Sequence, residues 1–262
     1  MSIKTLIAVL VSSLFILFSC GGGDGGSKES ASKPQAKEGK PASKGTDISM
    51  YSGTVTGTIN FKGTAPKPRR LRMDTECGAF HDGPVFMENV VVNENNSLKW
   101  VFVYVKEGLG DKKFDPPGKP VVFDQNGCQY KPHIFGVQTG QPIEILNSDP
   151  LLHNIHALPK NNRPFNFGMP KKGDTRERSF KKPEIMVRIK CDVHPWMGAY
   201  CGVVDNPYFS VSGDDGTFTI DHLPAGQYVI EAWHEEYGTM TQTVTVGDNE
   251  TKTVDFSMGP SS

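Results

Sequence analysis

The sequence predicts an all-β protein. From residue 51 onwards apolar and polar residues alternate in short runs, as Val55, Ile59 and Phe61 do against Thr54 and Thr58. Glycines and prolines close these runs, and residues 90–92 and 101–105 add valine-rich segments typical of buried strands. No segment of residues 51–118 shows a helical period, so no helix is expected there. More than two hundred residues follow position 50, enough for two β-sandwich units.

The first residues are typical of an exported protein. Lys4 precedes an apolar run, residues 6–18, that is too short to span a membrane and typical of a signal peptide. The run ends in LFSCG at residues 17–21, which resembles a bacterial lipobox. The resemblance implies a signal peptide over residues 1–19 and lipidation of Cys20, so that acyl chains anchor the chain in the bacterial cell envelope. Because no Asp follows Cys20, it favours the outer membrane, at its periplasmic face or at the surface. The alternative is an ordinary secretory peptide.

Residues 20–50 are expected to form a flexible tether. They consist mainly of Gly, Ser, Lys, Ala, Pro and Glu, with too few apolar residues to form a core. A chain of this length and composition has a typical reach of roughly 30 Å. We therefore expect the tether to hold the folded part away from the membrane.

The stretch from residue 189 to 200 carries the candidate chemistry. Cys191, His194 and Met197 follow one another at intervals of three, and Pro195 argues against a helix because an interior proline removes a hydrogen bond. A thiolate and two imidazoles with a weak Met ligand form a known one-electron copper site. Zinc is the chemical rival, although Met is a poor zinc ligand. The best candidate for the second histidine is His153, in a turn after the short strand expected at residues 143–146.

The loop Cys191-x-x-His194-x-x-Met197, with Pro195 inside it, resembles the ligand loop of the amicyanin and plastocyanin branch of the cupredoxins. Residues 130–143 and 153–156 are similar in order and spacing to the first half of that fold. The resemblance implies a cupredoxin-like Greek-key β-sandwich over residues 119–205 that binds one copper ion per chain. It also implies that His153, Cys191 and His194 are the strong ligands and Met197 the long axial one.

The same resemblance assigns roles around the ligands. It implies that Asn154 ties the two ligand loops together near the cysteine, and that Pro195 and Trp196 keep the site dry. It further implies that the ring edge of His194 reaches the surface, where electrons would leave. His156 is expected on the opposite side of its strand from His153, and so not as a ligand.

Residues 206–258 show a second recognisable unit. The motifs DGTFTI at 215–220 and LPAGQY at 223–228 are similar to the carboxypeptidase regulatory-like domain, a small transthyretin-like β-sandwich. Residues 52–59 resemble the start of such domains. The N-terminal β region, residues 51–118, could therefore complete either sandwich, and one open arrangement inserts the copper domain into a split sandwich. His234 and Glu235 are expected at the surface.

The five cysteines agree with an exported protein. Cys20 is assigned to lipid and Cys191 to copper, which leaves Cys77, Cys128 and Cys201. An oxidising compartment permits a disulfide, and we expect it between Cys77 and Cys128 because Cys201 follows the copper loop on an inward strand position. The open alternative is a second metal site made by four residues: Cys77, His81, Cys128 and His133.

The net charge of −1 gives no reason to expect a nucleic-acid partner. Between the ligand motifs lies a group of basic residues that could steer an acidic redox protein, although a solvated loop is the simpler explanation for them: Lys171, Lys172, Arg176, Arg178, Lys181 and Lys182. The sequence thus predicts a lipid-anchored electron-transfer protein with a redox protein partner. It is not expected to be an enzyme, because protein groups fill all four copper positions. The alternatives are a copper carrier or storage protein and an envelope scaffold or adhesion protein with a structural metal.

Overall fold

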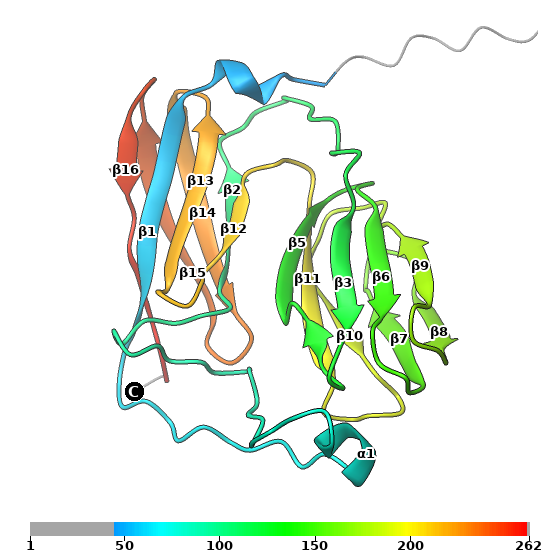
Figure 1. Cartoon of the computed structure of the whole chain (residues 1–262). Coiled ribbons are helices and arrows are strands. Elements are labelled where there is room, and N and C mark those ends of the chain that lie inside the picture. Colours follow the sequence, from blue (N-terminus) through cyan, green and yellow to red (C-terminus); the bar gives the residue numbers. More distant parts are fainter. Residues whose placement is uncertain (1–44, 261–262) are drawn as a thin grey trace, which may run out of the picture. The chain divides into compact units, whose positions relative to one another are not determined.

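The computed structural model describes residues 45–260, which form an almost entirely β structure (Figure 1). The expected signal peptide, Cys20 and most of the expected tether lie outside the described residues. The end of the tether segment contains one short 3-10 helix, η1 (Ile48–Met50). Within residues 45–260 no helix is long and apolar enough to cross a membrane.

One group of strands, which we call the first sandwich, comes from residues 121–204 and has two sheets. The strands of its five-stranded sheet, in spatial order, are β5 (Ile134–Gln138), β11 (Gly198–Val204), β10 (Glu184–Lys190), β7 (His153–Leu158) and β8 (Phe165–Met169). The strands of its four-stranded sheet are β4 (Tyr130–Lys131), β3 (Val121–Gln125), β6 (Ile143–Asn147) and β9 (Thr175–Arg178).

Alternation along the strands builds the core of the first sandwich. In β6, for example, Ile143, Ile145 and Asn147 are buried while the residues between them are partly exposed. Large side chains from both sheets, such as Phe123 and Phe135, pack in the same apolar cluster. The buried Cys191 and Met197 extend that cluster to the end of the sandwich, so the loop after β10 is anchored to the core.

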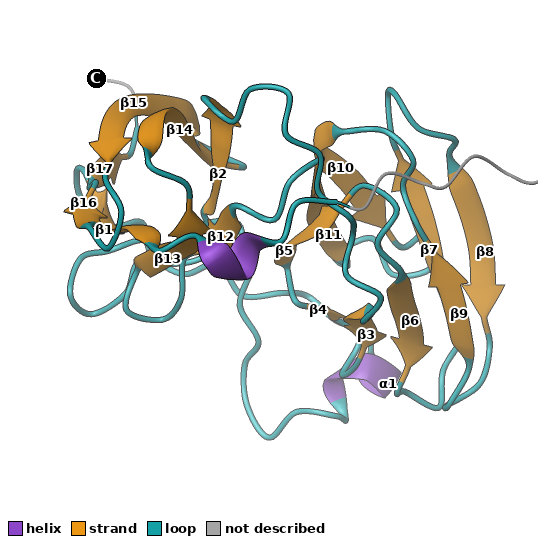
Figure 2. Cartoon of the chain, turned by 90° about the horizontal axis from the view of Figure 1, so that it is seen from above, coloured by secondary structure: helices purple, strands orange, loops and turns teal. Residues whose placement is uncertain are grey.

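The remaining strands form what we call the second sandwich. One sheet contains β13 (Thr217–Leu223), β1 (Gly53–Phe61), β16 (Thr251–Thr253) and β17 (Phe256–Met258). The other contains β12 (Phe209–Val211), β2 (Phe102–Glu107), β14 (Gly226–His234) and β15 (Gly238–Val246). Strands from both ends of the chain therefore complete one sandwich, with the first sandwich between them in sequence (Figure 1). The view from above shows the two sets of strands (Figure 2).

The region between β1 and β2 differs from the sequence-based expectation in two places. Residues 90–92 form no strand, because only Val92 bridges to Leu98, across the turn at residues 93–97. A short helix, α1 (Thr75–Gly78), stands where no helix was expected. Asp74 starts it by accepting a hydrogen bond from the Cys77 N–H. One turn is too short to leave a periodic pattern in the sequence.

The two sandwiches contact each other through an apolar junction. Phe102 and Tyr104 of β2 cluster with Ile134 of β5 and Val204 of β11. Gly202 is required at this junction, because a Cβ there would collide with the Phe102 ring. The absence of a side chain therefore lets an aromatic ring of the second sandwich lie directly on β11.

A polar contact accompanies this junction. His133 and Glu235 are joined through His133 Nε2 and Glu235 Oε1 at 2.5 Å. The expectation that His234 lies at the surface is wrong, since its side chain is 2% exposed. It stacks on Tyr237, and its Nδ1 accepts hydrogen bonds from the N–H groups of Glu236 and Tyr237. The turn after β14 folds back over the ring, which strand alternation does not reveal.

Candidate metal centre

The loop after β10 curls around the Cys191 sulfur. The Cys191 N–H donates to the Met197 carbonyl at 3.1 Å, and the Met197 N–H donates to the His194 carbonyl at 3.0 Å. The His194 N–H points at the Cys191 sulfur, at 3.3 Å. Pro195, which has no N–H of its own, occupies a position in this turn where none is needed. The local sequence thus holds a cysteine and a histidine beside each other.

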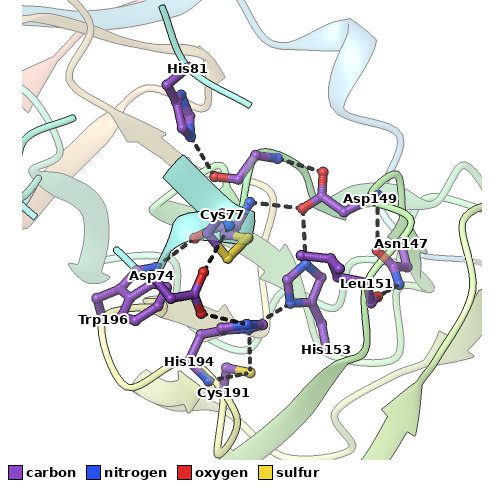
Figure 3. The surroundings of a disulfide bond; sticks show 12 residues. Asp74, Cys77, His81, Asn147, Asp149, Leu151, His153, Cys191, His194 and Trp196 are labelled. Atoms are coloured by element: carbon purple, nitrogen blue, oxygen red, sulfur yellow. Dashed lines mark hydrogen bonds and ion pairs between the residues drawn. A yellow bond between two sulfur atoms is a disulfide. The ribbon is translucent and has the colours of Figure 1, made fainter. Parts of the chain in front are cut away.

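The start of β7 adds the second histidine. Nδ1 of His153 lies 2.9 Å from Nδ1 of His194, and that second nitrogen lies 3.9 Å from the Cys191 sulfur (Figure 3). One ligand atom from each of the three residues fits within a span of 4.8 Å, and all three side chains are buried. The structure therefore brings together two ring nitrogens and one sulfur from segments nearly forty residues apart.

This donor set fits copper. One soft sulfur and two imidazole nitrogens are the combination that copper electron-transfer sites use. Both imidazoles direct the same ring atom, Nδ1, toward the sulfur side, and burial keeps water away from all three donors. His153, Cys191 and His194 could thus hold a copper ion without a change of fold.

Asp149 is a functional residue that the sequence reasoning missed. Its carboxylate lies 2.9 Å from His153 Nε2 and also accepts the backbone N–H groups of Gly127 and Cys128, each at 2.8 Å. Burial acts to raise the pKa of Asp149, but these hydrogen bonds lower it below its usual value. A carboxylate behind a ligand histidine fixes the ring and strengthens its donor nitrogen. The only signal was an acidic residue four positions before His153.

The electrostatics of His153 and His194 differ although their rings touch. Burial acts to lower the pKa of His153, but the hydrogen bonds to Asp149 and Cys191 raise it to about 9. The pKa of His194 is lowered, first by burial and then by the charge of His153. The two neighbouring rings are therefore shifted in opposite directions, and His153 holds a proton more readily than His194.

Asn154 connects the two ligand segments. Its Oδ1 accepts a hydrogen bond from the Cys191 thiol at 3.2 Å and from the Asp192 N–H at 2.7 Å. The backbone carbonyl of Asn154 accepts a hydrogen bond from the Tyr130 hydroxyl at 2.5 Å. These bonds hold the start of β7 against the loop after β10, and they restrict the position of the sulfur.

Two buried thiols of the first sandwich have opposite electrostatics. Burial alone raises the pKa of Cys201 well above its usual value. Burial also acts to raise the pKa of Cys191, but the interaction with His153 and the backbone N–H groups aimed at the sulfur lower it below its usual value. The thiolate is the form that binds metals. Cys191 is therefore prepared for a metal, and Cys201 is a packing residue.

The remaining predicted residues lie around the loop. Met197 is 2% exposed, and it lines with Cys191 and Trp196 a cavity of about 470 Å³ at the side of the loop. The Trp196 ring packs on His194, and its indole N–H donates to the Cys128 carbonyl at 3.0 Å. His156 lies outside the donor cluster and contacts the Asp192 carboxylate at 2.9 Å.

The His194 ring edge does not reach the surface as expected, because its side chain is buried beneath the segment that carries α1. The Asp74 carboxylate lies 3.9 Å from His194 Nε2. Cys77, at 0% exposure, is joined to Cys128 by a disulfide next to the same ring (Figure 3). Segment 74–78 belongs to neither sheet of the first sandwich, so its covering role could not be read from strand patterns.

The alternative second metal site does not assemble as the sequence suggested. Cys77 and Cys128 are paired, His81 contacts the Gly127 carbonyl at 2.8 Å, and His133 faces Glu235 in the junction. The two cysteines therefore pair with each other, and each of the two histidines has a partner outside the predicted set.

Comparisons with known proteins give one family match and several similar solved structures. The family profile described as carboxypeptidase regulatory-like domain matches residues 204–259. No curated protein matches the chain. Among solved structures, a copper-containing nitrite reductase from Thermus scotoductus SA-01 is 23% identical over 37% of this chain and 25% of its own, with a TM-score of 0.29.

Two further solved structures each match about a third of this chain. An amicyanin variant in the Cu(I) state is 20% identical over 32% of this chain and 81% of its own, with a TM-score of 0.29. A purple cupredoxin from Nitrosopumilus maritimus is 21% identical over 32% of this chain and 98% of its own, with a TM-score of 0.27. At these scores the likeness alone establishes no function. The chain thus combines an all-β fold, a carboxypeptidase regulatory-like segment and a buried donor set of one sulfur and two imidazole nitrogens that fits copper.

Proposed function

We propose that this protein is a cell-envelope electron-transfer protein that binds one copper ion through His153, Cys191 and His194, with Met197 as the weak axial ligand. The observation that carries the proposal is the convergence of Nδ1 of His153, Nδ1 of His194 and the Cys191 sulfur in one buried cluster. Copper bound there supplies one-electron transfer between its Cu(I) and Cu(II) states.

The chain's own residues hold that geometry fixed. Asp149 fixes the His153 ring, the His194 N–H points at the Cys191 sulfur, and the backbone bonds between Cys191 and Met197 close the loop. Because these bonds need no proton on the sulfur, they remain when the thiolate binds a metal, and the site needs little rearrangement when the charge changes. The protein acts as a carrier of electrons, with no substrate bound to the metal.

The proposed partner is a redox protein. Since the outer edge of His194 is covered, the accessible approach is the cavity beside Cys191, Trp196 and Met197. Exposed basic residues on and near β9 would favour a partner with an acidic surface: Lys171, Lys172, Arg176, Lys181 and Lys182.

Copper loading tests the proposal. The full chain carrying Cys20→Ser, so that this cysteine adds no thiol, would be loaded with Cu(II) and examined by visible absorption and EPR. We expect an intense thiolate-to-copper band at a stoichiometry of one ion per chain. Cys191→Ser should abolish the band, while Cys201→Ser, which removes the other buried thiol of the same core, should keep it. A band that survives Cys191→Ser would refute the site, and so would a colourless wild type.

Lipid anchoring through Cys20 is tested separately. In a bacterial host fed with labelled palmitate, we expect the wild-type chain to carry label and to sediment with membranes. The Cys20→Ser chain should lose both properties. Membrane association without label would replace lipidation by another mode of attachment.

A further inference from the structure

The Cys77–Cys128 disulfide lies directly against the proposed copper ligands. Its two sulfurs and one ring nitrogen of His194 fall within 4.8 Å of one another. The Cys128 sulfur also falls within 4.8 Å of a ring nitrogen of His153 and a carboxylate oxygen of Asp149. Both sulfurs are therefore next to histidines that also face Cys191 (Figure 3).

A carboxylate completes this outer cluster. Asp74 lies 3.9 Å from Nε2 of His194, the nitrogen not directed at His153 and Cys191. Asp74 also caps α1 by accepting the Cys77 N–H at 2.8 Å. The two sulfurs and the Asp74 carboxylate thus all lie close to the His194 ring. Sulfur and imidazole are ligands that Cu(I) prefers.

The segment that carries Cys77 makes few other polar contacts with the first sandwich, although Cys77 and Met73 pack against its core. We call residues 69–87 the strap; Leu71 and Val85, and Met87 and Arg69, hydrogen-bond within it at 2.8 Å. Apart from the disulfide, its polar contacts with the first sandwich among the described residues are His81 with the Gly127 carbonyl and Asp74 with His194.

The strap also borders open hollows. Cavities of about 860 Å³ and 360 Å³ lie along it, and His81 lines both. Glu76 and Gly78, on either side of the buried Cys77, are exposed. One layer of exposed chain therefore separates the sulfur pair from solvent, and breaking the disulfide removes the strongest attachment of the strap.

We propose that reduction of the Cys77–Cys128 disulfide creates a second metal site, for Cu(I), in which both thiolates bind the ion and Asp74 and the outward nitrogen of His194 lie beside it. A dithiol reductant supplies the two electrons and two protons: the S–S bond breaks, two S–H groups form, and the reductant becomes a disulfide. Cu(I) then displaces both thiol protons into solvent without changing its own oxidation state. The site rests on the proposed function only in sharing His194.

The charge of the cluster favours a monovalent ion. Two thiolates and one Cu(I) together carry a net negative charge. A copper ion bound at Cys191 on the other side of the His194 ring is therefore repelled less than it would be if the two thiolates held a divalent ion. The Cys77–Cys128 site, which we call the outer site, would place copper beside the His194 ring, and that ring in turn faces His153. Cu(I) bound at the outer site is therefore in a position to enter the inner site, which His153, Cys191 and His194 form.

Cu(I) stoichiometry tests the proposal. The full chain with Cys20→Ser would be treated anaerobically with dithiothreitol, freed of it, and titrated with Cu(I) against a coloured Cu(I) chelator. We expect one bound ion before reduction and two after it. Adding Cys77→Ser and Cys128→Ser should remove the second ion, whereas Cys201→Ser should retain it. Cys191→Ser should lose the ion bound at the proposed copper site and keep the ion that binds only after reduction. The experiment therefore shows separately whether each of the two sites binds Cu(I).

A second measurement needs no cysteine variant of the strap. Reduced protein would be alkylated with iodoacetamide with and without Cu(I), and the modified peptides identified by mass spectrometry. We expect Cu(I) to protect Cys77 and Cys128 together. An unchanged stoichiometry after reduction, equal alkylation with and without Cu(I), or protection by Zn²⁺ but not by Cu(I) would overturn the assignment.

Discussion

The two sandwiches bury different kinds of side chain. The second buries mainly apolar residues such as Val103, Ile230 and Phe256, although Glu231 and His234 of β14 are also buried. The first buries a chain of polar and ionisable groups at one end, including Asp149, His153 and His194. Burying such groups costs free energy unless each finds a partner. The difference shows that the first sandwich buries more of these costly groups, and that they gather at the end where the candidate site lies.

Matched truncations in the two cores test this contrast with the largest expected effect. Ile155 in β7 and Ile230 in β14 are both 0% exposed. We expect Ile155→Ala and Ile230→Ala each to lower the free energy of unfolding by about 2–5 kcal/mol. Ile155 adjoins Asn154, so Ile155→Ala should also shift the copper absorption band, whereas Ile230→Ala should leave it unchanged. Equal spectral shifts in both variants would mean that the core of the second sandwich affects the copper site as strongly as the core of the first.

Two histidines close to the junction should respond to pH in opposite directions. The pKa of His234 is lowered to about 4, and burial is the main cause. Its folded-state value lies below an unfolded value of about 6.5, so its stabilisation is present above pH 6.5 and is lost as the pH falls toward 4. The full difference corresponds to about 3 kcal/mol. His234→Gln should flatten the acid limb of the curve of unfolding free energy against pH.

His133 provides the opposite case. Burial acts to lower its pKa, but the hydrogen bond and charge of Glu235 outweigh it and raise the value. Stabilisation by the pair is therefore full below pH 6.5 and is lost as the pH rises through the raised folded-state pKa. Glu235→Gln should remove about 1.5–3 kcal/mol at pH 6 and less at alkaline pH. NMR titration of the two rings checks both signs, and a shift of both in the same direction would contradict this account.

The smallest of these effects concerns Asp149. Asp149→Asn keeps the shape but removes the charge behind His153, and we expect it to weaken Cu(II) binding by about 10–100-fold. In the metal-free protein it should also lower the pKa of His153 from about 9. Asp215→Asn, at an exposed turn of the second sandwich, serves as the control and should leave copper affinity unchanged. Unaltered affinity in Asp149→Asn would remove Asp149 from the site.

The all-β fold could be predicted because alternation is a local property. The inward positions of β1, for example, are visible in Val55, Ile59 and Phe61 without knowledge of their partners. Residues 90–92 have the same composition but no neighbouring strand to pair with, apart from one bridge. Residue composition favours an extended backbone in both segments, but a strand forms only where a neighbouring strand pairs with it.

The ligand loop, by itself, was encoded in the sequence. Cys191, His194 and Met197 lie on one short turn whose backbone hydrogen bonds close within seven residues, so their spacing already implies their proximity. The residue types alone indicated the kind of metal. Local geometry and ligand chemistry do not depend on the rest of the fold.

Only the tertiary structure decided what surrounds that loop. It placed Asp149 behind His153, laid the strap over His194 and set the Cys77–Cys128 sulfurs beside the proposed ligands. It also joined β1 and β2 to the C-terminal strands, more than a hundred residues away. Such contacts depend on how segments distant in the sequence pack together. The burial or turn pattern of one segment does not indicate which side chain of another segment will lie against it.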